Sequence, residues 1–386
     1  MAVIKVICVF FGGSLKEALA QAKAGETLRL ENVTLKAEIP GATVIFDSVV
    51  VLGNVHLEGI NFRGRRTSPV WKRAQPFMRR CGVLETGVKT GISADCGAQL
   101  KVENCKIHAG ISLLEGSRAA ITNTEFEGCS EPAILIDGDS AATIDCCQIH
   151  DSRSNGIFVT GGVAEVRNSE FWAFGTLAIG IQHPASVGTI VDCLIHDNVG
   201  NGIRVQDGAK DRIEGCDLHH PVETYPLIQV GSGAHATLDG CKVHDTRPSG
   251  ICVREGGTVE VRDTDFWACR QRAVYATDRA TAVHVINCRF GSEVAIPVYL
   301  EDEAYGKAEK CEIPRESCAI RSGSVLDLVE GGTACDECIV GGQPSDSIKL
   351  EDPLQESQQI MAELDLVVDI EDESRGLIYR MQRRRN

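Results

Sequence analysis

A short phrase recurs at nearly constant spacing through most of this 386-residue chain, and this repeat constrains the fold more than any other feature. In its clearest form, Asn, Asp or Gly precedes Cys, which is followed by a variable residue, an aliphatic residue and His. A period of 20 to 50 residues indicates a repeat architecture. The Cys, Ser or Thr of the phrase recurs in steps of 19 to 25 residues, at positions 105, 124, 147, 169, 193, 216, 241, 264, 288 and 311.

Each repeat unit contains two further short stretches. One is a small residue followed by alternating apolar residues, as in Gly156–Val159, Gly202–Val205 and Gly250–Val253; the other is an alternating stretch such as Thr258–Val261. Three stretches of period two, separated by Gly, Asn and Asp, predict three strands per unit, which is one coil of a parallel β-solenoid. No unit has the ten or more residues of helical period that a helical repeat requires, and a propeller blade needs four strands in a longer unit. The sequence therefore predicts an all-β parallel β-helix of about ten to twelve coils.

The same register gives a structural role to many of the 17 cysteines. The residue before the Cys is mostly Asn, Asp or Gly, which tolerate the positive φ of a sharp bend. The next side chain would then point inward and stack on its counterpart one coil away, ~4.8 Å along the axis. A buried free Cys behaves as a small hydrophobe. We predict an internal ladder of Cys105, Thr124, Cys147, Ser169, Cys193, Cys216, Cys241, Thr264, Cys288 and Cys311.

The recurring Asn/Asp-Cys-x-Ile-His-Asp and Gly-Ile-x-Val phrases resemble the right-handed parallel β-helix of the pectin-lyase-like superfamily, especially its carbohydrate-binding and sugar-hydrolase repeats. The resemblance covers roughly residues 25 to 330. Residues 14–19 and 25–30 resemble the short capping helix and first strand of such proteins. The resemblance implies a right-handed solenoid, but the superfamily includes lyases, hydrolases, epimerases and proteins without known catalysis, so it leaves the activity open.

Composition is that of a globular protein, with 43% hydrophobic and 24% charged residues. The longest apolar run, residues 6–13, is too short to span a bilayer, and its flanks fit a signal peptide poorly. We therefore expect a cytoplasmic protein with no membrane partner. The net charge of −15 argues against a general nucleic-acid binder, because such proteins concentrate positive charge on one face.

The early region departs from the repeat between residues 63 and 82. We interpret this stretch as a basic insertion. The solenoid that contains it is predicted to occupy residues 1–342. Such a patch could bind an anionic partner. The simpler interpretation, which we favour, is a solvated loop that pairs with the surface acids of the protein. The candidate patch consists of Arg65, Arg66, Lys72, Arg73, Arg79 and Arg80.

Residues 343–386 form a second segment. Between residues 343 and 373 it contains ten acidic residues and one basic residue, Lys349. This composition predicts an acidic linker leading into a short helical tail. Residues 363–370 and 375–385 resemble the segment that precedes the ATPase core of red-type rubisco activases and stage V sporulation K-like AAA proteins. The resemblance implies a module of, or an adaptor to, an AAA motor. The chain contains no Gly-x-x-x-x-Gly-Lys-Ser/Thr phosphate loop, and the sequence leaves open whether Asn386 is the natural end.

The residue after the aliphatic position of each phrase is predicted to form an outward column. Three successive coils place His196, His219 and His244 in this column, with Asp197 and Asp245 beside them. Such a column could bind a divalent metal or supply a general base. The alternative is that His-Asp is simply a favourable turn sequence after this strand. We favour that alternative, and we predict neither a metal nor a cofactor.

A second outward column is expected on the strand of the Gly-Ile-x-Val phrase. Gln, Arg and Tyr side chains in a row suit the hydroxyls and carboxylates of an extended glycan. The calcium-binding carboxylate cluster typical of uronate lyases, the paired Asp residues of galacturonases and the Asp-Pro-His signature of mannuronan epimerases do not occur there. The candidate ligand-binding residues are Phe158, Gln182, Arg204, Gln229, Tyr275 and Tyr299.

These features predict a non-catalytic recognition or scaffold module that binds a protein or a glycan. The alternative is a carbohydrate-active enzyme, a polysaccharide lyase, hydrolase or epimerase, that uses the outward His/Asp column together with Arg204. Cys335 and Cys338 form only half of a zinc site and receive no role. The open ends of a solenoid could mediate oligomerisation, although nothing in the sequence sets a stoichiometry.

Overall fold

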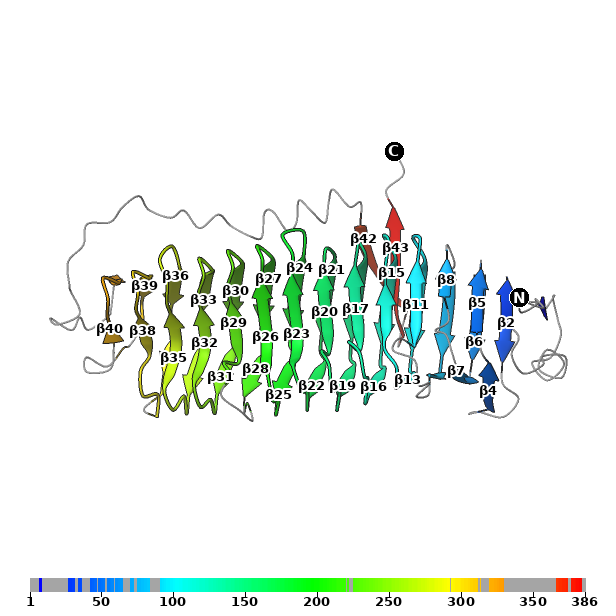
Figure 1. The fold of residues 1–386 in the computed structure, drawn as a ribbon, viewed down its shortest axis with the longest axis horizontal. Coiled ribbons are helices and arrows are strands. Elements are labelled where there is room, and N and C mark those ends of the chain that lie inside the picture. The colour runs from blue at the N-terminus through cyan, green and yellow to red at the C-terminus, as the bar shows by residue number, and fades with distance from the viewer. Residues whose placement is uncertain are drawn as a thin grey trace, which may run out of the picture. The chain divides into compact units, whose positions relative to one another are not determined.

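The computed structural model describes residues 75–83 and residues 91–329. Within the second range, residues 220, 222–224, 292, 312 and 314–318 are not described. Before residue 75 it describes the backbone of strands and the side chain of Leu57, and after residue 329 it describes the backbone of one hairpin. The chain divides into two compact units, residues 1–342 and 343–386. The first unit is a parallel β-solenoid, as predicted from the repeat, and its successive coils follow one another in chain order (Figure 1).

Three parallel sheets form the three walls of the solenoid, and each coil from β2 to β37 contributes one strand to each wall. We name them sheet A, with 15 strands, sheet B, with 14, and sheet C, with 12. Sheet A contains β1 (Ile7–Cys8), β2 (Thr27–Glu31), β5 (Ser48–Leu52), β8 (Val70–Lys72), β11 (Ile92–Asp95), β14 (Ile111–Leu113), β17 (Ile134–Asp137), β20 (Ile157–Thr160), β23 (Leu177–Gln182), β26 (Asn201–Gln206), β29 (Ile228–Val230), β32 (Ser249–Val253), β35 (Arg272–Ala276), β38 (Val298–Leu300) and β40 (Ala319–Ile320).

Sheet B contains β3 (Thr34–Lys36), β6 (Asn54–Glu58), β9 (Gln75–Arg79), β12 (Gln99–Glu103), β15 (Arg118–Thr122), β18 (Ala141–Asp145), β21 (Val163–Arg167), β24 (Val187–Val191), β27 (Lys210–Glu214), β30 (His235–Asp239), β33 (Thr258–Arg262), β36 (Ala282–Ile286), β39 (Tyr305–Glu309) and β41 (Val325–Val329). Sheet C contains β4 (Ala42–Phe46), β7 (Ile60–Gly64), β10 (Gly82–Val83), β13 (Lys106–Ile107), β16 (Glu125–Glu127), β19 (Gln148–His150), β22 (Glu170–Trp172), β25 (Leu194–His196), β28 (Asp217–His219), β31 (Lys242–His244), β34 (Asp265–Trp267) and β37 (Arg289–Phe290).

The core fills the inside of the solenoid with aliphatic side chains from every wall. In β26, for example, Ile203 and Val205 are fully buried while Arg204 between them is partly exposed. This alternation is what a strand with one face inward and one face outward requires. Because successive coils pair in register, each position of the repeat forms a column along the solenoid, both inside and outside. Candidate sites can therefore be read as columns.

The predicted internal ladder is confirmed. Cys105, Cys147, Cys193 and Cys216 are buried, as are Thr124 and the remaining members. The bend before each ladder residue has positive φ, for example 51° at Asn104 and 60° at Gly240. Burial raises the pKa of the Cys147 thiol to about 12, so this thiol stays protonated and unreactive near neutral pH.

The predicted basic insertion between residues 63 and 82 is wrong. Strands β7 to β10 form an ordinary coil, in which β8 pairs with β5 and β11 while β9 pairs with β6 and β12. The repeat phrase was not recognised in this coil because Arg80 occupies the bend position. Its φ is 52°, and most other coils have Asn, Asp or Gly at this position. Cys81, which follows it, is buried and begins the ladder.

The predicted helical tail is also wrong. Within residues 343–386, β42 (Leu366–Glu373) and β43 (Gly376–Arg383) form an antiparallel hairpin. The β-branched residues Val367, Val368, Ile370 and Ile378 favour strands over helix, a preference that the prediction from acidic composition did not take into account. The predicted capping helix over residues 14–19 lies outside the described residues, and the described part of the chain contains no helix that is long and apolar enough to span a membrane.

Candidate functional site

The outward column on sheet C is an aromatic stack that spans six coils. The rings of His150, Trp172, His196, His219, His244 and Trp267 follow one another at centroid distances of 4.1, 6.0, 5.4, 4.6 and 3.9 Å, with interplanar angles of 6° to 15°. The predicted column of His196, His219 and His244 therefore exists. Stacked rings cover each other's faces, so solvent reaches mainly their edges and nitrogens. This arrangement leaves little ring face for a sugar and directs attention to the nitrogen atoms.

The His-Asp pairs act at the turn that follows each strand of sheet C. Asp197 and Asp245 have φ of 52°, and their Oδ2 atoms lie 2.7 Å from Nδ1 of His196 and His244. Since an ionised carboxylate only accepts hydrogen bonds, Nδ1–H donates in both pairs. The same contact recurs at His150 and Asp151. These pairs have the turn geometry that we favoured over a catalytic role.

The coil of His219 departs from this pattern. Its His is followed by His220 rather than Asp, and Nδ1 of His219 lies 3.1 Å from Oδ1 of Asp217 in the same strand. The same oxygen lies 2.8 Å from Nε2 of His244 in the next coil. Partial burial opposes ionisation of Asp217, but hydrogen bonds from both histidines outweigh it and hold the pKa of this carboxyl below its usual value.

The outward face of sheet A holds most of the predicted ligand-binding residues. Phe158, Arg204, Gln229 and Tyr275 fall in one column, which continues to Tyr299. The pairing contradicts the placement of Gln182 in that column. Gly180 takes the position instead, because it pairs with Phe158 and Arg204 while Ile179 and Ile181 on either side of it pair with core residues of the neighbouring coils.

Gln182 belongs to a second outward column of the same face, two residues further along each strand. There it pairs with Thr160 in one neighbouring coil and with Gln206 in the other. Arg254 follows Val253 and lies in the continuation of this column, since Val205, Val230 and Val253 pair in successive coils. We call the outward residues of these two columns the sheet A face.

Arginine side chains cover the polar centre of the sheet A face. The Arg204 guanidinium is half buried, and burial together with the nearby charge of Arg254 lowers its pKa. No carboxylate of the described residues lies within ion-pair distance of Arg204. The Gln229 carboxamide, with its oxygen toward Arg254, accepts from Nη2 of that residue at 2.8 Å. Two arginines therefore lie together on this part of the face, with Arg254 Nε 3.4 Å from Glu255 Oε1 and the charge of Asp207 near Arg204.

Aromatic rings continue the face beyond Gln229. The Arg272 guanidinium lies 4.4 Å from the ring centroids of both Tyr275 and Tyr299. The Tyr299 hydroxyl donates to Glu301 at 3.0 Å, and the Tyr275 hydroxyl donates to the same carboxylate. Burial and this hydrogen bond raise the pKa of Tyr275 to about 12. Tyr275 is partly exposed on this face, whereas Gln229 and Tyr299 are mostly covered, with 7% and 5% of their surface exposed.

Arg204 and the histidine column lie on different walls. Arg204 belongs to β26 of sheet A, whereas His196, His219 and His244 belong to β25, β28 and β31 of sheet C. Among the described residues no hydrogen bond or ion pair joins the two sets. An enzyme site that combines them, as proposed from the sequence, gains no support from this geometry.

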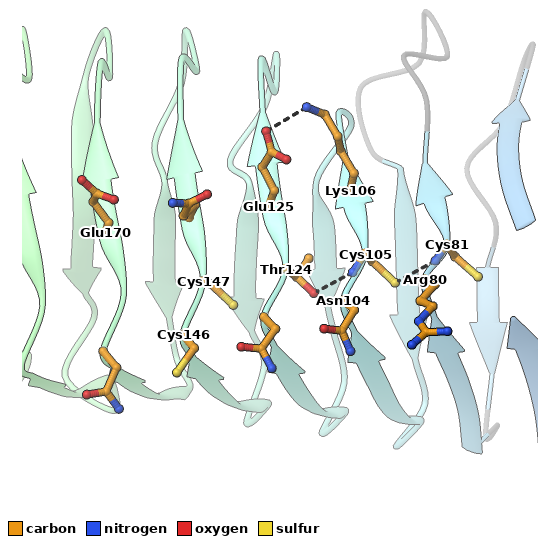
Figure 2. A pocket seen from close by; sticks show the side chains of 13 residues that line it. Arg80, Cys81, Asn104, Cys105, Lys106, Thr124, Glu125, Cys146, Cys147 and Glu170 are labelled. Carbon is orange, nitrogen blue, oxygen red and sulfur yellow. Dashed lines mark hydrogen bonds and ion pairs between the residues drawn. The ribbon is translucent and has the colours of Figure 1, made fainter. Parts of the chain in front are cut away.

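A shallow pocket of about 710 Å³ lies along the bend between sheets B and C (Figure 2). Two of its charged groups already bind each other, since Lys106 Nζ lies 2.8 Å from Glu125 Oε1. Behind them the ladder residues Cys81, Cys105 and Thr124 are joined by hydrogen bonds, drawn as dashed lines in Figure 2. The pocket is lined by Arg80, Cys81, Asn104, Cys105, Lys106, Asn123, Thr124, Glu125, Cys146, Cys147, Gln148, Asn168 and Glu170.

The candidate basic patch is only partly described. Arg79 and Arg80 are exposed at the end of β9, and Arg79 lies 3.8 Å from Glu103, an ion pair of the kind that a solvated surface forms. Lys72 lies in β8, of which only the backbone is described. Arg65, Arg66 and Arg73 lie outside the described residues, as do Cys335 and Cys338.

Comparison with known proteins agrees with the architecture. The family model described as "Right handed beta helix region" matches residues 90–219 and 179–324. These ranges do not reach residues 343–386, so the resemblance of that segment to AAA proteins gains no support. The comparison with curated proteins found no match.

Several solved structures are similar in fold. The periplasmic alginate epimerase AlgG is 11% identical, with 85% of each chain covered and a TM-score of 0.49. The AlgE6 A-module, a mannuronan C-5 epimerase of Azotobacter vinelandii, is 10% identical over 85% of this chain and 93% of its own, with a TM-score of 0.43. The catalytic unit of a GH87 α-1,3-glucanase from Streptomyces thermodiastaticus is 12% identical over 86% and 69%, with a TM-score of 0.44.

At these identities and TM-scores the similar structures assign no activity to this chain. The family model, by contrast, covers more than half of the chain and coincides with the coils that the structure describes in full. The chain belongs to the family of right-handed parallel β-helix proteins.

Proposed function

We propose that the protein is a carbohydrate-active β-helix that binds an extended acidic polysaccharide along the sheet A face. One observation carries the proposal. Arg204 is a half-buried guanidinium whose pKa is lowered by burial and by the charge of Arg254, an effect that the charge of Asp207 only partly opposes. Two like charges held together at a partly desolvated surface favour an anionic ligand that neutralises them.

The rest of the face suits a sugar chain. Glutamine amides can bind sugar hydroxyls, and tyrosine and phenylalanine offer apolar surface with a polar edge. Phe158, Gln182 and Arg204 are partly exposed in three successive coils of this face, and Tyr275 is partly exposed further along, so several sugar units could be contacted along the solenoid axis. The net charge of −15 would repel a polyanion elsewhere on the protein, so binding should depend on this local cluster.

The binding test is a calorimetric titration with oligouronates and with neutral oligosaccharides of equal length. We expect the acidic oligomer to bind more tightly, with an affinity that falls as salt is added. Arg204→Ala should weaken binding roughly 10- to 100-fold, the range for loss of a charge-assisted hydrogen bond. Arg167→Ala is the matched control, because Arg167 lies outward on sheet B and pairs with Glu165. Equal affinity for neutral oligomers, or equal effects of the two substitutions, would contradict the proposal.

Turnover of the bound glycan is the second candidate function, and His183 favours it. This exposed residue follows Gln182 on the sheet A face and has a φ of 92°, a strained value of the kind that collects at functional sites. Its Nδ1 accepts from the Ala185 N–H at 3.3 Å, so the neutral ring carries its proton on Nε2. The side chains of His183 and Asp137 both lie near Gly161. Nδ1 of His183 and Oδ1 of Asp137 are each 3.9 Å from the position that a Cβ atom on this glycine would occupy. Product analysis of the same mixtures separates enzyme from recognition module, since only an enzyme changes the oligouronate.

A further inference from the structure

We propose that Asp217, His219 and His244 form a site for a divalent transition metal such as Zn²⁺, on a different wall from the glycan-binding face. Asp217 Oδ1, a nitrogen of His219 and a nitrogen of His244 all lie within 4.8 Å of one another. Two imidazoles and one carboxylate form a ligand set that Zn²⁺ and its first-row neighbours prefer over Ca²⁺ or Mg²⁺.

The distances fit a shared metal. Ligands at ~2.0–2.1 Å from one Zn²⁺ stand about 2.9 to 3.4 Å apart at angles between 90° and tetrahedral. Asp217 Oδ1 lies 3.1 Å from His219 Nδ1 and 2.8 Å from His244 Nε2, and the ligand atoms of the two histidines lie within 4.8 Å of each other. Because the two rings are stacked, one or both of these partly exposed side chains would rotate to bring all three atoms into range. The side chains are 33%, 27% and 12% exposed, which leaves room for a water molecule in the fourth position.

Hydrogen bonding orients His244 for this role. Its Nδ1–H donates to Asp245 Oδ2 at 2.7 Å, which in a neutral ring leaves the lone pair on Nε2. Nε2 of the same ring lies 2.8 Å from Asp217 Oδ1, so the ring is held between two carboxylates, and a metal at this place would replace the proton that Nε2 shares with Asp217. A carboxylate that holds the second nitrogen of a ligating histidine is the usual support of such metal sites.

The site arises from a departure from the repeat. The other histidines of the column that have an Asp after them, His150, His196 and His244, direct Nδ1 to that Asp. His219 is followed by His220, and its Nδ1 turns instead to Asp217. A metal here would bridge the adjacent strands β28 and β31. Lys242 Nζ lies 3.8 Å from Asp217 Oδ2, and its positive charge weakens the binding of a metal cation at this site. Removal of this charge is therefore expected to strengthen metal binding.

Titration of the chelator-treated full chain with Co²⁺ and Zn²⁺ tests the site. Co²⁺ bound to nitrogen and oxygen gives visible d–d bands without the intense thiolate charge-transfer absorption that binding to any of the 17 cysteines would produce. We expect one nitrogen/oxygen-ligated Co²⁺ per chain, displaced by Zn²⁺. His219→Ala and Asp217→Asn should weaken its binding at least tenfold, and Asp245→Asn about 10- to 100-fold.

Two further variants complete the test. His196→Ala, in the same stack but outside the three ligands, should bind Co²⁺ as the unaltered protein does. Lys242→Gln should bind it more tightly because a nearby positive charge is removed. Circular dichroism confirms that each variant is folded. Failure to bind nitrogen/oxygen-ligated Co²⁺, or equal binding by folded Asp217→Asn, overturns the proposal and leaves the cluster as an ion pair; glycan binding by the sheet A face is unaffected by either outcome.

Discussion

Asp211 is a carboxyl group inside the solenoid, among residues that are otherwise apolar. It points inward from β27, pairs in the column with Gly188 and Ala236, and is only 3% exposed. Among the described residues neither of its oxygens has a hydrogen-bond partner. Burial raises its pKa to about 8, so the carboxyl is protonated in the folded protein at neutral pH. A Cβ on Gly188 would lie 2.3 Å from Asp211 Oδ1, so that glycine makes room for the carboxyl.

Asp211→Asn should stabilise the protein at alkaline pH and have little effect near pH 4. The unfolded carboxyl titrates near ~3.9, so between that value and about 8 only the unfolded state loses the proton. This group therefore lowers the free energy of unfolding as pH rises, by at most about 1.4 kcal/mol per pH unit, until the folded pKa is passed.

Urea unfolding of both proteins at pH 4.5, 6 and 8 measures the effect. The difference between their midpoints should widen as pH rises. Asp239→Asn, at an exposed position at the end of β30, is the control and should show no such widening. A constant difference for Asp211→Asn across the range would contradict an uncharged Asp211.

Single residues show where prediction from the sequence ends. The positive-φ bends at Asn104, Asn168 and Gly240 were predictable, because those residue types tolerate the conformation. Arg80 adopts the same conformation without that preference, since pairing of the neighbouring strands determines it. Asp211 was not predicted either, because Ile213 is the only apolar residue in the run Lys210–Glu214 and a carboxyl group is not expected beside it on the inward face.

The internal ladder shows why an element of the repeat keeps Cys, Ser or Thr. The Cys193 N–H donates to Cys216 Sγ in the next coil at 3.4 Å. The Cys216 thiol in turn donates to the Glu214 carbonyl at 3.2 Å. Ser169 makes the same pair of contacts with oxygen in place of sulfur. The ladder position therefore needs a small side chain that both accepts and donates, which size alone does not explain.

A pair of substitutions of equal shape isolates this requirement. Cys216→Thr keeps an acceptor and a donor, as Thr264 does in a later coil, whereas Cys216→Val removes both. Valine leaves the buried Cys193 N–H without its partner, so it should be about 1–3 kcal/mol less stable than threonine. Denaturant unfolding of the two variants measures the difference. Equal stability would show that only apolar volume matters in the ladder.

At the scale of elements, the sequence predicted strands well inside the repeat and poorly outside it. The same bends recur in successive coils. The register between neighbouring strands therefore follows from the alignment of the repeat phrases in the sequence. The segment at residues 366–383 has no such internal comparison, and the acidic composition of the stretch before and within it led to the wrong prediction of a helix. In β23, a glycine at the outward position shifted the predicted alignment of Gln182 by two residues.

The whole molecule presents two different surfaces on one scaffold. Sheet A carries arginine, glutamine and tyrosine, while sheet C carries stacked histidines and tryptophans held by carboxylates. The sequence predicted both columns because each is a fixed position of the repeat. It did not predict which side chains interact between coils, such as Arg204 with Arg254 or Asp217 with His244. These contacts depend on side-chain conformation, which the spacing of the repeat does not specify.

The central claim is that the sheet A face binds an acidic glycan, and the structure of the protein with a bound oligouronate tests it most directly. The account predicts a sugar chain that runs across β23, β26, β29 and β32, with its carboxylates against Arg204 and Arg254. An oligouronate bound on sheet B or sheet C, or one that leaves Arg204 without contact, would contradict it.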